Sequence, residues 1–512
     1  MLYKIKKIKE ISFLFRSTAL LTMLLFSACK SINAVERVTV NFNYVTSEAK
    51  TLSKSSYSKP SMVKNNITQS EYAQIDFNKA KALWKIEQLP FGLEMFHLGY
   101  IYKTPILLNE FKNDYTQELR FSNELFNFGN LTNNRLAEAK NLSGYAGFKI
   151  LYPINEPHIF GEIISFLGNE QYRALGRDNI YGAYASAVSF LDDNQKLNNS
   201  YFTKFWLGKP NKKAKSILFY ALSDSPKAST AYEFKITPGE ITSLDIKSVV
   251  FPRENIDKLA IAPLKTFYLY GENTLTHYKS YYPEVHNSDG LIISEDENIV
   301  WHPLQNPKSL LKFNHPVKKL KYFGLLQRDR NYNNYLNPSI PFQKMPNVWI
   351  EPKDDWGAGS VEIIEQPTNN YNDNNVAVFW KPVEPLTKGK SYSFNYTLNW
   401  SLQPPKTDKA PVVATYIGRK NNVYTFLVLY SDENLKKLSP VTVLTPKVDL
   451  SNNAVLVSPP TVQKDPYNNN WRVLFSIKPK DINSKSPIEA SCSLSNNKKQ
   501  LLTETWNNIW IP

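Results

Sequence analysis

Cysteine, histidine and glycine are all scarce in this chain of 512 residues, which contains only 2 Cys, 6 His and 18 Gly. Two cysteines exclude a cysteine-rich metal site and a disulfide scaffold. The sequence also contains no HExxH motif, no glycine-rich phosphate loop and no GxSxG nucleophile elbow. We therefore expect neither a cofactor nor a bound metal, and we expect His286 to act as a hydrogen-bonding residue.

Acidic residues are outnumbered, with 46 Asp and Glu against 61 Lys and Arg, so the formal net charge is +15. The excess lysines are scattered along the chain, without a basic helix or an arginine-rich block. This pattern argues against nucleic acid as a partner. It fits solubility, or a mild attraction to anionic polymers and membrane surfaces.

Long hydrophobic runs are missing except near the N-terminus, where a basic segment precedes STALLTMLLFSA (17–28) and Cys29. This layout predicts a secretory signal over residues 1–34 and an exported protein, because the apolar run is too short to span a bilayer. Phe26 to Cys29 also resembles a lipoprotein-processing box, so lipidation of Cys29 and ordinary cleavage nearby, for example after Ala34, both stay open. Either outcome leaves Cys492 without a disulfide partner.

Aromatic residues are abundant, at 13% of the chain, and alternation dominates its patterning. Residues 38–44 (VTVNFNY), 391–400 (SYSFNYTLNW) and 471–478 (WRVLFSIK) place apolar side chains on one face, as half-buried strands do. Helical patterns are fewer: 70–86 predicts a helix with a Ser70 cap, and 181–190 suits either a helix or a strand. The sequence predicts a mainly β protein.

A proline-rich segment without apolar periodicity, at 403–411, divides the chain. We predict a large β-sandwich over 35–402, this linker, and a smaller immunoglobulin-like β-sandwich over 412–512. The smaller part has the size and strand rhythm of such a module but lacks its disulfide.

Several segments, taken together and in order, are more specific than any single motif. They include ALWKIEQLPFGLEMFHLGYIYKTP (82–105), YRALGRDNIYG (172–182), PEVHNSDGL (283–291), WIEPKDDWGAGSVEIIEQPT (349–368) and NDNNVAVFWKP (372–382). In this series the chain resembles the periplasmic glucan biosynthesis protein G and D family, from about residue 75 to 400. The resemblance implies a periplasmic location, a large sandwich with a polysaccharide cleft, and a role in making or trimming osmoregulated periplasmic glucans.

The resemblance also implies a mechanism, because members of this family are β-1,2-glucan hydrolases of the inverting type. Inverting hydrolysis needs a carboxylic acid and a separate carboxylate base with room for a water between them. The family's acid corresponds to Asp373, in an Asn-rich loop before a strand. From spacing alone, a turn-capping role for Asp373 is the more common outcome, since Asp in such loops usually bonds to its own backbone.

The family's base position holds Asn287 in this chain, and an amide cannot take up a proton as a general base. Asp289 is the nearest substitute. It would share a face with Asn287 in an extended segment but would point away from it in a turn. Phe342 stands where family members carry a tyrosine, so a second hydroxyl is also missing.

Four further residues are candidates for binding sugar rings, because flat aromatic faces and planar guanidinium groups suit carbohydrate. They are Trp356, Arg328, Trp349 and Trp301. Core packing or an internal ion pair is the alternative for each, and this alternative is favoured for Trp301 and Trp349, which lie in strand-like runs. Trp356, between Asp355 and Gly357, is expected to be the more exposed ring.

Two functions follow as expectations. The first is a periplasmic protein that binds a linear β-1,2-glucan and cleaves or trims it, with Asp373 as acid. The second is a non-catalytic glucan-binding or scaffold protein that lost its base at Asn287. The expected partners are a β-glucan and the membrane glucan synthase, with a lipid on Cys29 as the sole membrane attachment.

Overall fold

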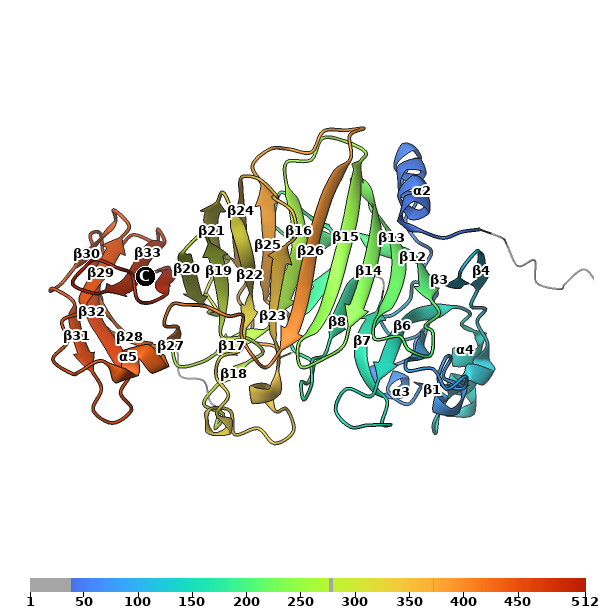
Figure 1. The fold of residues 1–512 in the computed structure, drawn as a ribbon, viewed down its shortest axis with the longest axis horizontal. Coiled ribbons are helices and arrows are strands. Elements are labelled where there is room, and N and C mark those ends of the chain that lie inside the picture. The colour runs from blue at the N-terminus through green and yellow to red at the C-terminus, as the bar shows by residue number, and fades with distance from the viewer. Residues whose placement is uncertain (1–37, 169, 276–279, 372) are drawn as a thin grey trace, which may run out of the picture.

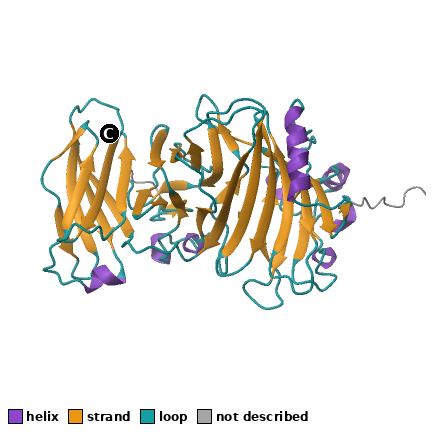
Figure 2. Cartoon of the chain, turned by 45° about the horizontal axis from the view of Figure 1, so that its top comes forward, coloured by secondary structure: helices purple, strands orange, loops and turns teal. Residues whose placement is uncertain are grey.

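The computed structural model of the protein describes residues 38–168, 170–275, 280–371 and 373–512. The predicted signal and Cys29 therefore lie outside the described residues. The structure is mostly β, with two large sheets, one five-stranded sheet and a few short helices (Figures 1 and 2). This confirms the prediction of a mainly β fold of the sandwich class. In the described ranges no helix is both long and apolar enough to cross a membrane.

The larger sheet has 14 strands and runs through most of the molecule. In spatial order its strands are β29 (Thr445–Leu450), β33 (Ile488–Ser495), β34 (Thr505–Trp510), β20 (Asn298–Pro303), β19 (Gly290–Glu295), β22 (Leu320–Leu326), β23 (Asn347–Pro352), β26 (Tyr392–Ser401), β15 (Thr242–Pro252), β14 (Ala228–Thr237), β13 (Ile217–Asp224), β12 (Tyr201–Gly208), β3 (Leu107–Lys112) and β4 (Tyr115–Glu118).

The second sheet has 11 strands and packs against the first. Its path is β2 (Gly92–His97), β6 (Tyr145–Tyr152), β7 (Gly161–Leu167), β8 (Gln171–Ala174), β9 (Tyr184–Ser186), β16 (Leu259–Thr266), β25 (Val376–Pro382), β24 (Gly359–Glu365) and β21 (Leu311–Val317), with β10 (Ser189–Leu191) and β11 (Leu197–Asn199) beside β16. The five-stranded sheet contains β27 (Val412–Lys420), β28 (Val423–Tyr430), β32 (Trp471–Pro479), β30 (Ala454–Leu456) and β31 (Thr461–Lys464).

Short elements complete the fold. Two small ribbons pair β1 (Asp76–Phe77) with β5 (Phe126–Asn127) and β17 (Tyr268–Tyr270) with β18 (Val285–His286). The helices are α2 (Phe42–Lys54), α3 (Gln69–Tyr72), α4 (Asn133–Asn141) and α5 (Glu433–Lys437), with 3₁₀ turns η1 (Lys79–Lys81), η2 (Asn123–Leu125), η3 (Tyr332–Asn334) and η4 (Phe342–Lys344).

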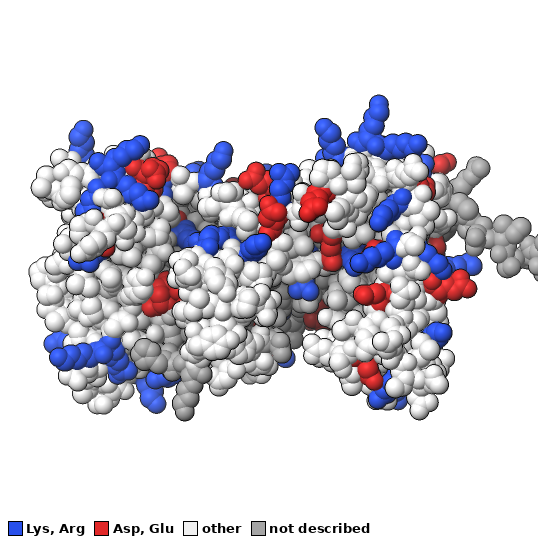
Figure 3. Space-filling model, turned by 90° about the horizontal axis from the view of Figure 1, so that it is seen from below, with Lys and Arg blue, Asp and Glu red and all other residues white. Residues whose placement is uncertain are grey.

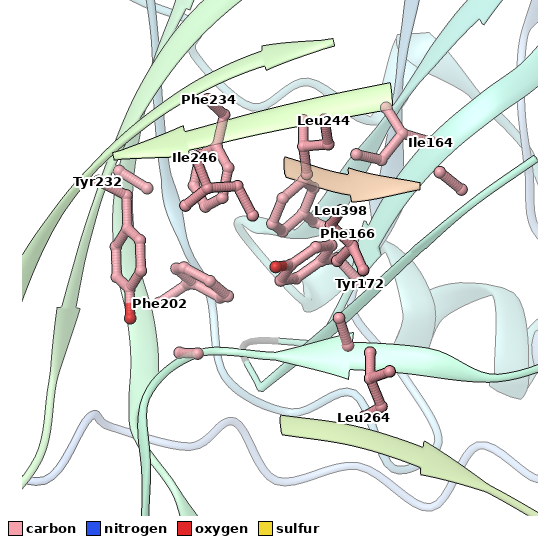
Figure 4. Packing of buried hydrophobic residues seen from close by; sticks show 14 of the residues in the cluster. Ile164, Phe166, Tyr172, Phe202, Tyr232, Phe234, Leu244, Ile246, Leu264 and Leu398 are labelled. Atoms are coloured by element: carbon pink, nitrogen blue, oxygen red, sulfur yellow. The ribbon is translucent and has the colours of Figure 1, made fainter. Parts of the chain in front are cut away.

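The main hydrophobic core lies between the two large sheets, where aromatic rings interlock (Figure 4). Phe166 of β7 contacts Phe234 of β14 with ring centroids 5.7 Å apart, and Phe234 stacks on Tyr232 at 5.3 Å. The predicted alternation in β26 is confirmed, because Phe394, Tyr396 and Leu398 are buried on its core face. These contacts hold the two sheets as one rigid support for the loops at their ends.

Two predicted elements are wrong at the N-terminal end. Residues 38–44 do not form a strand, because the Asn41 side chain accepts a hydrogen bond from the Tyr44 N–H and starts helix α2 there. Val45 and Ala49, four residues apart, then bury one face of α2 against the outer side of β13 and β14. The short alternation over residues 38–44 could not compete with this capped amphipathic helix.

The helix predicted over 70–86 is likewise mostly absent. Thr68, not Ser70, caps the short helix α3 through a reciprocal capping box with Glu71. The chain then turns into β1, whose Phe77 pairs with Phe126 of β5. The ambiguous segment 181–190 forms strands β9 and β10.

The larger sheet crosses from the portion before the predicted linker into the portion after it. Strand β34 pairs in parallel with β20, aligning Thr505 with Val300 and Trp506 with Trp301. A second hydrophobic cluster is shared, because Trp301 and Leu326 pack with residues of β28, β32 and β34. The boundaries at 403 and 411 stay a prediction, but the strands on either side of them are hydrogen-bonded to each other.

Cys492 offers a direct check on this shared core. Burial raises the pKa of its thiol to about 12, although a hydrogen bond from Tyr430 acts in the opposite direction. Only the thiolate attacks a thiol reagent, and the thiol is protonated at every pH below that value. In a Cys29→Ser chain at mildly alkaline pH, we expect no reaction with DTNB while the protein is folded. Complete reaction is expected after unfolding in urea, and equal native and unfolded rates would contradict the burial.

Candidate functional site

Two cavities lie close to the backbone of residues 266–268, where strand β16 ends and β17 begins. Thr266 pairs with Val376 of β25, so the residues just before β25 run beside this turn. The Asn375 amide binds both backbone groups of Tyr268: it accepts from the N–H at 2.9 Å and donates to the carbonyl at 3.0 Å. This link fixes the loop that carries Asp373 against the loop that precedes β17.

The first cavity, called here the Asp373 cavity, has a volume of about 480 Å³. Its lining is mostly polar and comprises Tyr184, Gln195, Lys196, Leu197, Lys265, Ile364, Gln366, Pro367, Thr368, Asp373, Asn374, Asn375 and Ala377. The volume falls within the range of about 300–1,000 Å³ that small-ligand sites occupy. Amide, ammonium and phenol groups of this kind can donate to and accept from sugar hydroxyls.

Asp373 is exposed and held by its own loop. Thr368 Oγ1 donates to Asp373 Oδ2 at 2.7 Å, and Asn370 Nδ2 donates to Oδ1 at 3.2 Å. These are the loop-capping bonds expected from spacing alone, yet they leave the carboxyl on the cavity wall. Capping and a site role are therefore compatible for this residue.

Lys265 and Tyr371 add a cation and an aromatic face to this region. Burial lowers the pKa of Lys265, whose Nζ donates to Asn199 Oδ1 at 3.4 Å. Tyr371 is 51% exposed, and its ring lies 6.2 Å from that of Phe267. It is thus an exposed ring two residues before Asp373.

The second cavity, called here the interface cavity, has a volume of about 310 Å³ and lies between the large sandwich and the five-stranded sheet. It is lined by Tyr268, Glu272, Asn273, Glu284, Asp289, Trp301, Pro303, Arg328, Asp329, Asn334, Val412, Val413, Ala414, Thr415, Tyr416, Leu429, Asn468 and Asn470. Thr415 of β27 donates its backbone N–H to Glu272 at 3.3 Å, so the two parts of the protein meet across this space.

Asp289 belongs to the interface cavity and not to the Asp373 cavity. Its Oδ2 accepts backbone N–H bonds from Arg328 and, at 2.7 Å, from Asp329. Its Oδ1 lies 3.4 Å from His286 Nδ1. Burial raises the pKa of Asp289, and the charge of His286 and the backbone bonds only partly offset this effect.

His286 is buried beside three carboxyl groups. Its Nε2 lies 2.8 Å from Glu284 Oε2, and its ring stacks on Tyr268 with centroids 5.1 Å apart. Burial lowers the pKa of His286, but its hydrogen bond to Glu284 and the charges of Asp289, Glu284 and Glu272 outweigh burial and raise the pKa to about 9. Burial, with the charges of Glu284 and Asp289, raises the pKa of Glu272 to about 8. At neutral pH, protons held by His286 and Glu272 therefore offset the crowding of carboxyl groups in this region.

Asn287 follows strand β18 and belongs to the lining of neither cavity. Its N–H donates to the carbonyl of Phe267 at 2.9 Å, next to the ring that contacts Tyr371. Alternation along the chain places it on the face opposite His286. Phe342 is buried in the same small hydrophobic cluster as Phe267. The two positions at which this chain departs from the family pattern thus border one cluster near the Asp373 loop.

The four candidate sugar-binding residues are dispersed. Trp301 is buried, and the Arg328 guanidinium lies over its ring, 3.5 Å from the centroid, at the wall of the interface cavity. Trp349 is buried in β23 and donates from Nε1 to Glu351 at 2.5 Å. Trp356 is half-buried and packs on Trp380 with ring centroids 5.2 Å apart, so it is not the exposed platform that its neighbours in the sequence suggested. None of the four lines the Asp373 cavity.

Sequence reasoning missed Tyr371, Tyr184 and Lys265 beside Asp373. The pattern Tyr-Asn-Asp at 371–373 could have indicated an aromatic ring next to the acid. Nothing in the linear sequence connects Tyr184 or Lys265 with residue 373, because strands β9, β16 and β25 bring them together.

The fold and these cavities define a mainly β sandwich protein with polar, solvent-accessible sites at its loops. The chain belongs to the periplasmic glucan biosynthesis protein family: the family model described as "Periplasmic glucan biosynthesis protein, MdoG" matches residues 40–510, nearly the whole chain. The protein is accordingly periplasmic and has a role in periplasmic glucan biosynthesis.

Proposed function

We propose that the protein binds a linear β-1,2-linked glucan in the Asp373 cavity as its contribution to periplasmic glucan biosynthesis. The observation that carries this proposal is the combination at one cavity of an exposed carboxyl, at Asp373, with polar walls that include Tyr184. The exposed ring of Tyr371 lies outside the lining but two residues before Asp373 in the same loop. A glucose unit presents hydroxyls at its edge and C–H groups on its faces, which match these two kinds of surface.

The charge pattern agrees with a neutral polymer as ligand. On the face shown in Figure 3, Lys and Arg side chains are scattered and interspersed with Asp and Glu, without one dominant patch. Lys196 and Lys265 lie with Asp373 in the same cavity, so this lining carries both signs of charge. Hydrogen bonding and ring contacts, rather than net charge, would then select the ligand.

Hydrolysis of the bound glucan is a second candidate function, favoured by the exposed Asp373 carboxyl. An inverting reaction would use Asp373 as the acid that protonates the leaving oxygen. The base is less well supplied, because Asn287 cannot accept the proton and Asp289 lines a different cavity with Oδ2 held by two backbone N–H groups. We therefore infer that binding is the main activity of this chain and that cleavage is slow.

Replacing the exposed ring beside Asp373 tests the proposed binding site. We expect Tyr371→Ala to raise the Kd for linear β-1,2-glucan by roughly 5- to 30-fold, since loss of a well-placed ring costs about 1–2 kcal/mol of binding free energy. Isothermal titration calorimetry of the mature protein measures this. The matched control is Tyr467→Ala, which removes a ring that is 94% exposed and far along the chain, after β31. Equal affinities for wild type and Tyr371→Ala would contradict the assignment.

A further inference from the structure

The wall of the interface cavity holds an arrangement that the glucan-binding role does not use: Glu284 and Asp289 line the cavity, and His286 is buried directly behind them. One ligand atom from each of Glu284, His286 and Asp289 lies within 4.8 Å of the other two. Glu272 lines the same space. Among the residues that the structure describes, no lysine or arginine side chain forms an ion pair within 4.0 Å with the carboxylates of Glu272, Glu284 or Asp289. The ion pairs of Glu284 and Asp289 in this part of the chain therefore depend on His286 alone.

His286 supplies the second observation. Its side chain is 1% exposed, and Nδ1 has no hydrogen-bond partner although it faces Asp289. Nε2 is within hydrogen-bonding distance of Glu284, and the raised pKa of His286 keeps a proton on Nδ1 near neutral pH when no ion is bound. A metal ion would take the place of that proton between Nδ1 and Asp289 Oδ1 and release it to solvent.

The spacing of these two atoms fits a metal ion. Neighbouring ligands of a tetrahedral Zn²⁺ site, with bonds of about 2.0–2.2 Å, lie about 3.3–3.6 Å apart. His286 Nδ1 and Asp289 Oδ1 are 3.4 Å apart. Backbone N–H bonds hold the other oxygen of Asp289, which fixes the direction of Oδ1.

We propose that the interface cavity binds one divalent first-row transition metal ion, Zn²⁺ or Mn²⁺, through His286 Nδ1 and Asp289 Oδ1. Glu284 orients the imidazole from the other side, as carboxylates behind metal-bound histidines do. Water completes the coordination and can bridge the ion to Glu272, which lines the same cavity. A nitrogen ligand favours these ions over Ca²⁺, which takes oxygen ligands.

Such an ion would also join the two parts of the protein. Glu272 accepts the Thr415 N–H of β27, and residues 412–416 form one wall of the cavity. Binding to the folded state alone raises the Tm as the metal concentration rises. Sequence analysis predicted no bound metal, because a separation of three residues does not show that the side chains of His286 and Asp289 face each other.

Calorimetry and thermal melting of the mature protein after treatment with EDTA test the proposal. Zn²⁺ or Mn²⁺ alone is expected to bind at one ion per chain and to raise the Tm, whereas Ca²⁺ has little effect. Glu284→Gln should weaken binding by about 10- to 100-fold, and Asp289→Asn by about 100-fold or more. Both substitutions preserve size, so at least one folded variant is expected even if His286→Gln fails to fold.

The matched control is His158→Gln, which removes an exposed histidine outside the cavity and should leave the affinity unchanged. Absence of stoichiometric Zn²⁺ and Mn²⁺ binding would overturn the proposal, and the triad would then be a buried imidazolium between two carboxylates. Binding that survives Asp289→Asn and Glu284→Gln unchanged would overturn it as well. Glucan affinity is a separate measurement at the Asp373 cavity, so neither result depends on the other.

Discussion

Substitution of Glu504 by alanine should lower the free energy of unfolding by about 3–5 kcal/mol, the cost of leaving one member of a buried ion pair alone. Glu504 is fully buried, and its carboxylate accepts hydrogen bonds from both terminal nitrogens of the Arg328 guanidinium. The N–O distances are 2.7 Å to Oε1 and 2.8 Å to Oε2. It also accepts the Val412 N–H at 2.9 Å. The pair therefore ties the loop after β22 to both the start of β27 and the segment before β34.

Urea unfolding followed by tryptophan fluorescence measures this effect. Glu504→Gln should cost less, because the amide oxygen still accepts from Arg328 while the charge is lost. The matched control is Lys447→Ala, which breaks a surface pair with Asp449 whose side chains are 70% and 60% exposed. Exposed pairs contribute about 0–1 kcal/mol. Similar losses for Glu504→Ala and Lys447→Ala would contradict a stabilising role for the buried pair.

Restoring a carboxylate at residue 287 should turn slow cleavage into measurable hydrolysis. Asn287→Asp is expected to raise the rate at which β-1,2-glucan yields new reducing ends by roughly 10²- to 10⁴-fold, the usual contribution of a positioned general base. The reason is chemical, since only the carboxylate can take the proton of the attacking water. The double variant Asn287→Asp with Phe342→Tyr should be faster still if the missing hydroxyl also contributes.

Two controls separate this result from background cleavage. Adding Asp373→Asn to Asn287→Asp should remove the gained activity, because the leaving oxygen would lose its acid. Asp289→Asn in the wild-type chain tests the substitute base: loss of residual cleavage without loss of folding would support Asp289. If Asn287→Asp folds and binds glucan as tightly as wild type but cleaves no faster, residue 287 is not a base position in this protein.

The local alternation of apolar and polar residues was sufficient to predict several of the strands. Strands β26 and β32 were predicted because alternation over the ten residues 391–400 and the eight residues 471–478 has no helical equivalent, and their core faces are buried as expected. The failure at 38–44 has an equally local cause, because the Asn41 cap lies within the strand-like run and the helical spacing of Val45 and Ala49 follows directly after it. Short runs are decided by the residues that follow them.

The site was less accessible to sequence reasoning. Asp373 was found through resemblance, since its own spacing indicated a capping residue. The separation of Asp289 from Asp373 depends on the turn at 287–289 and on the backbone bonds of Arg328 and Asp329, and neither is encoded in a local pattern. Arg328 was chosen as a sugar ligand, but it pairs with Glu504, 176 residues later. Contacts across such distances follow from the strand order of the large sheet.

The parallel alignment of β20 with β34 has a consequence for synthesis. The edge of β20 stays open until the chain has been extended through Trp506, because no earlier segment pairs with that side of the strand in the described fold. A polypeptide interrupted before Thr505 would present an unpaired, tryptophan-bearing strand edge, which is a template for association with other chains. Completion of the last strand is thus the event that closes this edge.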